Sequence, residues 1–330
     1  GLPEVEITGS EVIAFPIEGE EFTPQEEMQE AVNHNSNLAE FLDEGYLGEL
    51  SVELRSAYED DLESRSEWEE TYTKGLDQLG IKHEERTQPF EGASGVTHPL
   101  ISESVTQFQA QAYKELLPSG GPVQTQVMGM QDVAREEQAA RVKDFMNYQL
   151  TEVMEEFDPD MDQLLFYLPL SGSTFKKVYY DTTKQRAVSK FLPAQDLVVP
   201  YAATDLLSAT RITHVLRMDK NEVRKMQVTG MYRDVELSKF DPNEDEVRQK
   251  VDNKSVITID EGSGEVLCIR RNFEEGTVLA KKIQYFVHYR FLPGLGFYGF
   301  GLIHMIGGLG RAATSILRQL IDAGTLANLP

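Results

Sequence analysis

The feature that most constrains the fold is a long apolar helix pattern near the C-terminal end of the sequence. Apolar side chains recur there at alternating steps of four and three residues, the spacing of one face of an α-helix. This seam consists of Leu302, Ile306, Leu309, Ala313, Ile316, Leu320, Ala323 and Ala327. A second stripe (Ile303, Leu317, Ile321) widens it and leaves a narrow polar face of Arg311, Ser315, Arg318 and Asp322. Such a helix requires burial on most of its sides.

A glycine-rich junction precedes this helix, and a strand pattern precedes the glycines. We expect the junction to act as a hinge, because glycine tolerates backbone angles that other residues avoid. Its hinge glycines are Gly294, Gly296, Gly299 and Gly301. In the strand pattern, alternation predicts that one set of side chains faces the core and that the other faces solvent. The first set is Ile283, Tyr285, Val287, Tyr289 and Phe291; the second is Lys282, Gln284, His288 and Arg290.

Four interpretations of this C-terminal stretch compete. A dinucleotide site fits the spacing Gly294, Gly296, Gly299, but bulky aromatics fill the spacer and the nearest suitable acid, Asp322, lies inside the helix. A membrane span fits the uncharged residues 291–310, although glycines dilute them and two arginines interrupt the seam that follows. Packing against copies of itself fits the small residues beside the seam. An ordinary core helix is the default interpretation.

Charge is distributed unevenly along the 330 residues. The formal net charge is −24, and residues 1–70 hold 21 acidic side chains against Arg55 and Arg65. This balance disfavours sequence-specific binding of nucleic acid. The single cysteine, Cys268, excludes an internal disulfide and Cys-cluster metal sites, and we expect it to be a small core residue in a strand. The first thirty residues contain no basic side chain, so no signal peptide is expected.

Helical patterns dominate the first half of the chain. After an acidic flexible arm at residues 1–35, an acidic helical region covers 36–80, with a break near Gly45 and Gly48. A helix over residues 99–116 follows, N-capped by Thr97, then a strand at 123–128 and a helix over 132–157. The acidic cluster 155–162 predicts a solvated turn between helices, with Asp160 as a cap.

Strand patterns dominate the second half. Period-two alternation predicts strands over residues 173–181, 186–193, 196–201 and 209–218, then a short helix at 220–229. A polar insertion reaches Asn253, and a hairpin joins 256–260 to 265–273 through a turn with positive φ angles at Gly262 and Gly264. Helices gathered before strands indicate an α+β fold with a mixed or antiparallel sheet.

The sequence shows no pattern of catalysis. It lacks the nucleophile-elbow, phosphate-loop and zinc-protease motifs. Asp158, Asp160 and Asp162 fit the start of a calcium loop, but glutamine and proline stand where glycine and glutamate are needed. His98 lacks a partner at metal spacing and is expected to be structural. We therefore expect no enzyme, no cofactor and no metal; an enzyme with an unrecognised acidic site at residues 158–162 is the alternative.

Several stretches resemble the portal proteins of tailed double-stranded DNA bacteriophages, in particular the short-tailed, P22-like type. The residues that carry the resemblance are PFEGASGVTHPLISE at 89–103 with the Pro-Ser-Gly-Gly-Pro break at 118–122, FYLPLSGSTFKKVYYD at 166–181, LPAQDLVVPYAATDL at 192–206 and the block from 290 to 330. The last block is the most specific. Residues 1–80 contribute little to the resemblance.

The resemblance implies a subunit of a twelve-membered ring at one capsid vertex. Residues 81–295 would be its α+β wing domain, and 296–330 a glycine-rich junction and first stem helix; the family's clip, second stem helix and crown have no counterpart here. Implied partners are copies of the chain, double-stranded DNA passing without sequence specificity, terminase, capsid protein and tail adaptor proteins, without a membrane. Implied locations are the virion's portal vertex and, during assembly, the host cytoplasm. The membrane-inserting pore built from residues 291–310 remains the alternative.

The charge of the chain agrees with a conduit for DNA. Neutralising many phosphates with Lys or Arg would release counterions and hold DNA in place, which a mainly acidic ring avoids. On the stem helix, Arg311 and Arg318 would either form a sparse basic ring or pair between neighbouring subunits.

Overall fold

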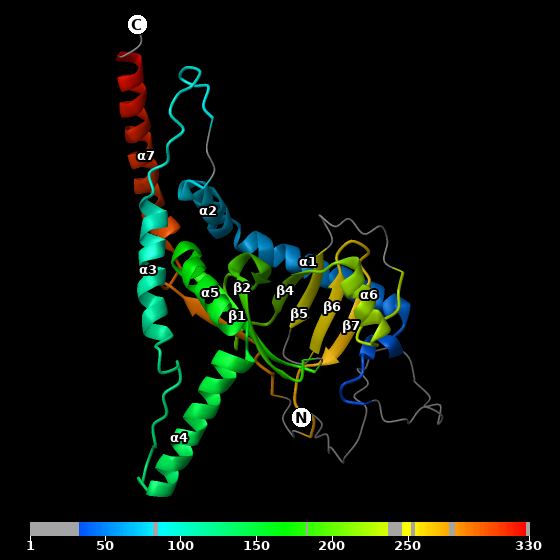
Figure 1. Ribbon diagram of the computed structural model, residues 1–330. Coiled ribbons are helices and arrows are strands. Elements are labelled where there is room, and N and C mark those ends of the chain that lie inside the picture. The colour runs from blue at the N-terminus through cyan, green and yellow to red at the C-terminus, as the bar shows by residue number, and fades with distance from the viewer. Residues whose placement is uncertain are drawn as a thin grey trace, which may run out of the picture. The chain divides into compact units, whose positions relative to one another are not determined.

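The computed structural model describes residues 33–81, 85–182, 184–236, 246–251 as backbone only, 255–276 and 281–327 (Figure 1). The chain divides into two units, residues 1–36 and 37–330. In the first unit the described residues form a turn in which the Ser36 amide donates to the Asn33 carbonyl (2.9 Å). The rest of the arm expected at residues 1–35 lies outside the described residues.

The unit of residues 37–330 is an α+β structure with antiparallel sheets, as the sequence pattern predicts. Its helices are η1 (Leu38–Phe41), α1 (Glu44–Ser64), α2 (Ser66–Leu76), η2 (Asp77–Leu79), α3 (Leu100–Leu116), α4 (Val133–Tyr148), η3 (Gln149–Val153), α5 (Phe157–Ser171), η4 (Ala194–Asp196), α6 (Lys220–Val228) and α7 (Leu302–Ala327). Its strands are β1 (Ser173–Asp181), β2 (Arg186–Pro193), β3 (Leu197–Val198), β4 (Ile212–Arg217), β5 (Glu246–Val251), β6 (Ser255–Asp260), β7 (Val266–Arg271) and β8 (Phe286–Arg290).

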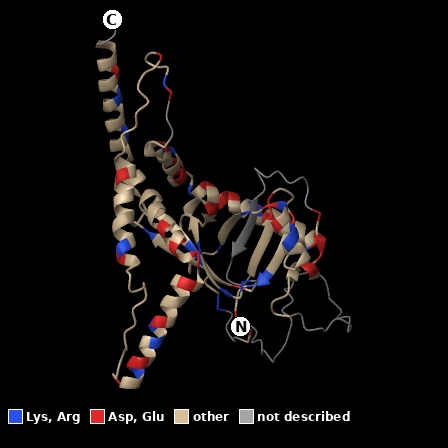
Figure 2. Cartoon of the chain, viewed as in Figure 1, with Lys and Arg blue, Asp and Glu red and all other residues tan. Residues whose placement is uncertain are grey.

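The strands form two sheets. The smaller has the order β2-β1-β8 and the larger β3-β4-β5-β6-β7, and all neighbours are antiparallel. Helix α1 covers one face of the larger sheet, where Leu47 and Leu54 pack against Ile257 and Ile259. Helix α6 packs against the same sheet through Val223, which contacts Leu267 of β7. Most acids of α1 remain on its outer side (Figure 2), and the exception, Asp61, is buried and pairs with Arg211 (2.6 Å).

The smaller sheet is packed on both faces, although Val178, Tyr180 and Val287 remain exposed. Helix α5 packs on one face through Leu164 and Leu165, which contact Phe191. On the other face Phe175 and Phe286 belong to the largest buried cluster. The expected orientation of the last strand is therefore wrong: Phe286 and His288 face this cluster, and Val287 is exposed. Tyr289 packs on the α5 side, because a strand covered twice needs no polar face.

The acidic cluster protects the open edge of the smaller sheet. The Asp160 carboxylate accepts the amide of Phe191 (2.6 Å), and Glu156 accepts that of Ser189 (3.4 Å). Both amides belong to edge strand β2, whose unpaired donors would otherwise invite another strand. The expectation that Asp160 caps a turn is therefore wrong: α5 begins at Phe157, inside the cluster.

Three further expectations differ from the structure. The acidic helical region breaks at Arg65 rather than at Gly45 and Gly48, which lie within α1. The polar insertion before Asn253 contains β5, which pairing on both sides holds in the sheet despite its polar sequence. In the hairpin turn, only Gly264 of the two glycines has positive φ.

Residues 123–128 are extended but pair with no described strand. Their backbone instead follows α4, where the Asn147 side chain accepts the Val123 amide (2.9 Å) and donates to its carbonyl (3.2 Å). The Thr125 hydroxyl donates to Ala139 of the same helix (3.0 Å). Helix α4 contains no buried residue, so this extended segment is its main cover in the part of the chain that is described. The segment predicted as a strand therefore runs alongside α4, the helix that comes next in the sequence, instead of joining a sheet.

Candidate functional site

The candidate site is the region where α7 leaves the body of the unit. The backbone at the start of α7 crosses the junction between α5 and β1, and the two backbone segments are in direct contact. A Cβ atom at Gly301 would lie 2.3 Å from the Leu170 carbonyl oxygen, and one at Gly299 2.4 Å from that of Gly172. Gly172 has φ of +86° and lies against the Phe300–Gly301 backbone. Glycine is required here because two backbone segments touch.

The expected hinge glycines therefore have a packing role. None of the four has a positive φ. At Gly296 a Cβ would meet the Tyr201 ring at 2.4 Å, and at Gly294 the Tyr298 carbonyl oxygen at 2.0 Å. Close contacts of this kind hold the junction in one arrangement. Hinge motion about these glycines stays a prediction.

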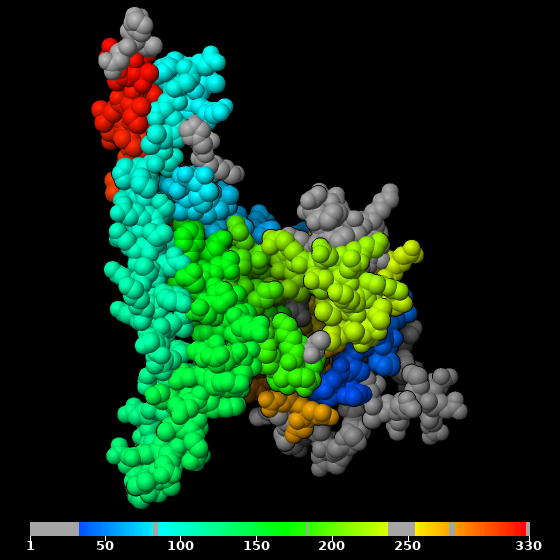
Figure 3. Space-filling view, in the orientation of Figure 1, coloured from blue at the N-terminus to red at the C-terminus, as the bar shows by residue number. Residues whose placement is uncertain are grey.

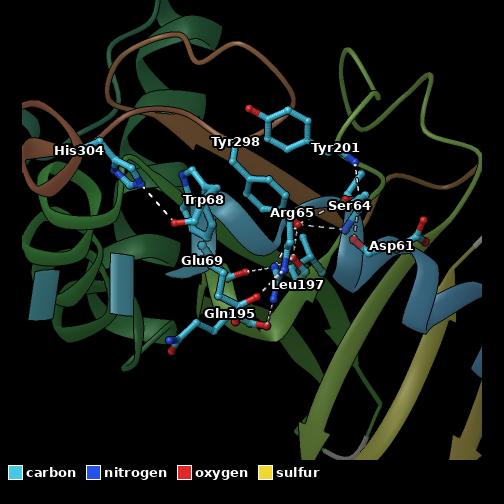
Figure 4. A network of polar contacts seen from close by, with 12 residues as sticks. Asp61, Ser64, Arg65, Trp68, Glu69, Gln195, Leu197, Tyr201, Tyr298 and His304 are labelled. Carbon is cyan, nitrogen blue, oxygen red and sulfur yellow. Dashed lines mark hydrogen bonds and ion pairs between the residues drawn. The ribbon is translucent and has the colours of Figure 1, made fainter. Parts of the chain in front are cut away.

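A buried polar network anchors the junction (Figure 4). Arg65, 1% exposed, donates from one terminal nitrogen to the carbonyls of Ala194 (2.8 Å) and Leu197 (3.2 Å) and to the Tyr298 hydroxyl (3.1 Å). Its Nε lies 3.1 Å from a Glu69 carboxylate oxygen, without hydrogen-bond alignment. A buried guanidinium is tolerated when its donors meet acceptors in this way.

The Tyr298 hydroxyl is the centre of this network. It donates to the Leu197 carbonyl (3.0 Å) and accepts from the Val199 amide (3.0 Å) and from Arg65. Burial raises the pKa of Tyr298, so the hydroxyl keeps its proton. One hydroxyl thus joins the helix break at Arg65, strand β3 and the glycine-rich junction.

Trp68 and His304 connect the network to the start of α7. The Trp68 ring stacks on Tyr298 (4.8 Å between centroids) and on His304 (5.7 Å), and its Nε1 donates to the Gly299 carbonyl (3.0 Å). The His304 Nδ1 accepts the Gly301 amide (3.2 Å), one of the free donors at a helix start. Burial lowers the pKa of His304, which favours the neutral ring that this contact needs.

The polar face of α7 binds its own chain. An extended strap, residues 94–98, runs antiparallel to the helix. The Ser94 amide donates to Asp322 (2.7 Å), Arg318 Nε donates to the Val96 carbonyl (2.7 Å), and the His98 amide donates to the Thr314 hydroxyl (3.0 Å). Successive contacts are two residues apart along the strap and four residues apart along the helix. The expected N-cap role of Thr97 is wrong, since Pro99 holds that position and Thr97 belongs to the strap.

From Leu309 onward the apolar seam of α7 points away from the rest of the unit, whereas its first members, Leu302 and Ile306, pack against the buried cluster of Ile101 and Leu170. Leu309, Ile316 and Leu320 are 64%, 58% and 67% exposed. On the opposite side, Ile303, Gly307 and Gly310 are buried, the glycines beside Gln78. An α-helix turns by about 100° per residue, so the seam lies roughly opposite the packed face. The helix thus presents its most apolar surface to solvent.

A cleft of about 770 Å³ lies between α7, the end of α2 and the loop before the strap. All four polar residues predicted from the seam pattern line it: Arg311, Ser315, Arg318 and Asp322. Arg318 and Asp322 also hold the strap, whereas Arg311 and Ser315 are exposed. The structure therefore brings these four side chains together, beside residues from α2 that sequence reasoning did not include.

The acidic cluster forms no metal site. Among the described residues, no group of His, Cys, Asp and Glu could hold a metal ion. Asp158 accepts the Tyr113 hydroxyl (2.6 Å), and Asp162 accepts the Gln109 amide (2.7 Å). No helix in the described ranges is both long and apolar enough to cross a membrane. Cys268 is buried in β7, as expected for a core residue.

Sequence comparison adds no family to these observations. The chain matches no model of a known protein family and no curated protein.

The network around Arg65 and Tyr298 was not anticipated from the sequence. The only signal was Arg65 within the apolar spacing of a helix, between Leu62 and Trp68. A lone basic residue at such a position normally marks an exposed face.

Proposed function

We propose that this chain is a subunit of a portal ring like those of tailed double-stranded DNA phages, with a portal wing at residues 81–295 and a first stem helix within 296–330. The observation that carries the proposal is the exposed seam of α7, opposite the face that packs on its own chain. An apolar surface on so long a helix needs a cover, and a second α7 offers one of matching length and chemistry.

A ring fits the distribution of surfaces on α7. The strap occupies one side of the helix and the seam the other, so each copy has room for a neighbour on the seam. A Cβ atom added at Gly308 or Gly324 would meet nothing within 4 Å, which leaves space for a close approach between helices. When one surface binds a different surface on the next copy, the assembly closes into a ring if the rotation between neighbours divides a full turn evenly.

The role as a DNA conduit follows from charge and from the resemblance. A net charge of −24 keeps duplex DNA from adhering, so DNA passes without sequence specificity. In this proposal the chain is not an enzyme. Its partners are terminase, capsid protein and tail adaptor proteins, and its location is the portal vertex of the virion.

Negative-stain microscopy and mass photometry of the chain test the ring. We expect rings with a central channel, and we expect Leu320→Asp to reduce them to monomers. The matched controls are Leu207→Asp and Val228→Asp, which change side chains 70% and 76% exposed outside α7. A chain that remains monomeric at all concentrations would overturn the proposal, as would equal loss of rings in the controls.

A further inference from the structure

The cleft beside α7 has a charge that is unusual for this chain. Four lining side chains are basic, Lys74, Arg86, Arg311 and Arg318, against two acidic ones. The chain as a whole has 55 acidic and 31 basic residues. In Figure 2, α1 and α2 carry mainly acidic segments, whereas α7 carries Arg311 and Arg318 against one acid, Asp322. The cleft is therefore a local basic site on an acidic molecule.

One cation of the cleft is available for a ligand. Arg318 donates hydrogen bonds to the strap, Arg86 donates to the Ser94 carbonyl (3.2 Å), and Lys74 pairs with Glu70. Arg311 is exposed and makes no hydrogen bond or ion pair with any residue that the structure describes. Its planar guanidinium matches a carboxylate in a two-point contact.

The cleft also offers apolar surface. Pro89 and Phe90 line it from the loop, and Ala323 and Leu326 line it from the last turns of α7. Its volume lies within the range of about 300–1,000 Å³ typical of ligand sites. In Figure 3 the loop and the upper part of α7 stand beside each other at one end of the unit. A ligand here would combine negative charge with apolar side chains.

We propose that this cleft binds an acidic peptide segment containing apolar residues, supplied by a protein partner. Nucleic acid fits less well. A duplex needs a row of free cations for its phosphates, and the chain's overall negative charge repels it at long range. One free guanidinium beside apolar surface suits one carboxylate next to an apolar side chain. The polar residues of the site lie on a different side of α7 from the exposed seam residues Leu309, Ile316 and Leu320, and only Ala323 belongs to both surfaces. Binding in the cleft therefore does not depend on ring formation.

A labelled peptide tests this inference. A synthetic peptide of alternating glutamate and leucine serves as the probe, because it combines carboxylates with large apolar side chains, carries no Lys or Arg, and has no copy in the chain itself. Fluorescence anisotropy would measure its binding to the full chain. Arg311→Glu should weaken binding at least about tenfold, and raising the salt concentration should weaken it further. Arg141→Glu is the control, since Arg141 is an exposed arginine on α4.

The alternatives give distinct outcomes. Equal affinity for Arg311→Glu and the unchanged protein would overturn the proposal, and so would equal binding of a peptide with glutamine in place of glutamate. Binding of a duplex oligonucleotide that Arg311→Glu abolishes would also overturn it, in favour of a nucleic-acid surface. Repeating the titration with Leu320→Asp separates the cleft from assembly, because that change lies on the seam.

Discussion

At the scale of single residues, the Tyr298 hydroxyl makes a large contribution to the free energy of unfolding for one polar atom. Tyr298→Phe keeps the ring stacked on Trp68 but leaves a donor on Arg65, the Val199 amide and the Leu197 carbonyl with one partner fewer. Unmet buried polar groups typically cost about 1–3 kcal/mol. We expect the free energy of unfolding to fall by about that amount in urea denaturation. Tyr180→Phe, an exposed tyrosine on β1, should change it little, and an equal loss there would contradict the account.

His288 makes the free energy of unfolding depend on pH. Its ring lies between Phe175 and Phe297 (4.5 and 4.6 Å between centroids), and burial first, then Arg290, lower its pKa to about 3. The unfolded chain takes up a proton near pH 6.5, and the folded chain does not. Stability is therefore full above about pH 6.5 and decreases as the pH falls toward 3, by up to about 1.4 kcal/mol per pH unit.

His288→Phe should flatten this dependence, measured as the slope of unfolding free energy between pH 6.5 and 5. The slope should decrease without vanishing, because burial lowers the pKa of His214 as well. An unchanged slope in the variant would show that His288 titrates normally in the folded protein.

At the scale of elements, the strap and α7 hold each other through separable contacts. Asp322→Ala removes the acceptor of the Ser94 amide, and Thr314→Val removes that of the His98 amide. Losing a hydrogen bond of about 1–1.5 kcal/mol corresponds to roughly tenfold faster local exchange. Hydrogen exchange followed by NMR should show the Ser94 amide deprotected in the first variant and the His98 amide in the second. Deprotection of both amides in both variants would show that the strap opens as one unit.

Elements with a strong period of their own were predictable from the sequence. Strands β1 and β2 have their predicted bounds, α6 ends one residue before its predicted end, and α7 covers the predicted seam from Leu302 to Ala327, because residue spacing alone specifies these elements. Strand β5 and the strap were not predictable in this way. Backbone pairing with β4 and β6 holds β5, and side chains of α7, more than 200 residues later, hold the strap. A local sequence pattern records neither kind of contact.

The candidate site was predictable only in part, for a related reason. The sequence pattern grouped Arg311, Ser315, Arg318 and Asp322 on one helix face, and the structure places them together along the cleft. It did not indicate that Arg318 and Asp322 bind the strap, since the partners are backbone groups more than 200 residues earlier. Polar faces normally meet water, and here the apolar seam is exposed instead.

At the scale of the whole molecule, the crossing at Gly301 sets the direction of α7 relative to the two sheets. Gly301→Ala would place a methyl group 2.3 Å from the Leu170 carbonyl oxygen, so backbone must move. Overpacking of this kind costs about 1–3 kcal/mol. Gly48→Ala in α1 is the matched control: it lies outside α7, its methyl meets nothing within 4 Å, and alanine in a helix gains up to about 1 kcal/mol over glycine.

The same pair of variants connects the junction to the proposed ring. A ring closes only when every copy holds its neighbour at one angle, and a shifted α7 changes that angle. We expect Gly301→Ala to lower the unfolding free energy and to convert closed rings into open arcs or smaller assemblies in mass photometry. Closed rings of unchanged size from a destabilised Gly301→Ala chain would show that neighbouring copies, rather than the crossing, set the direction of α7.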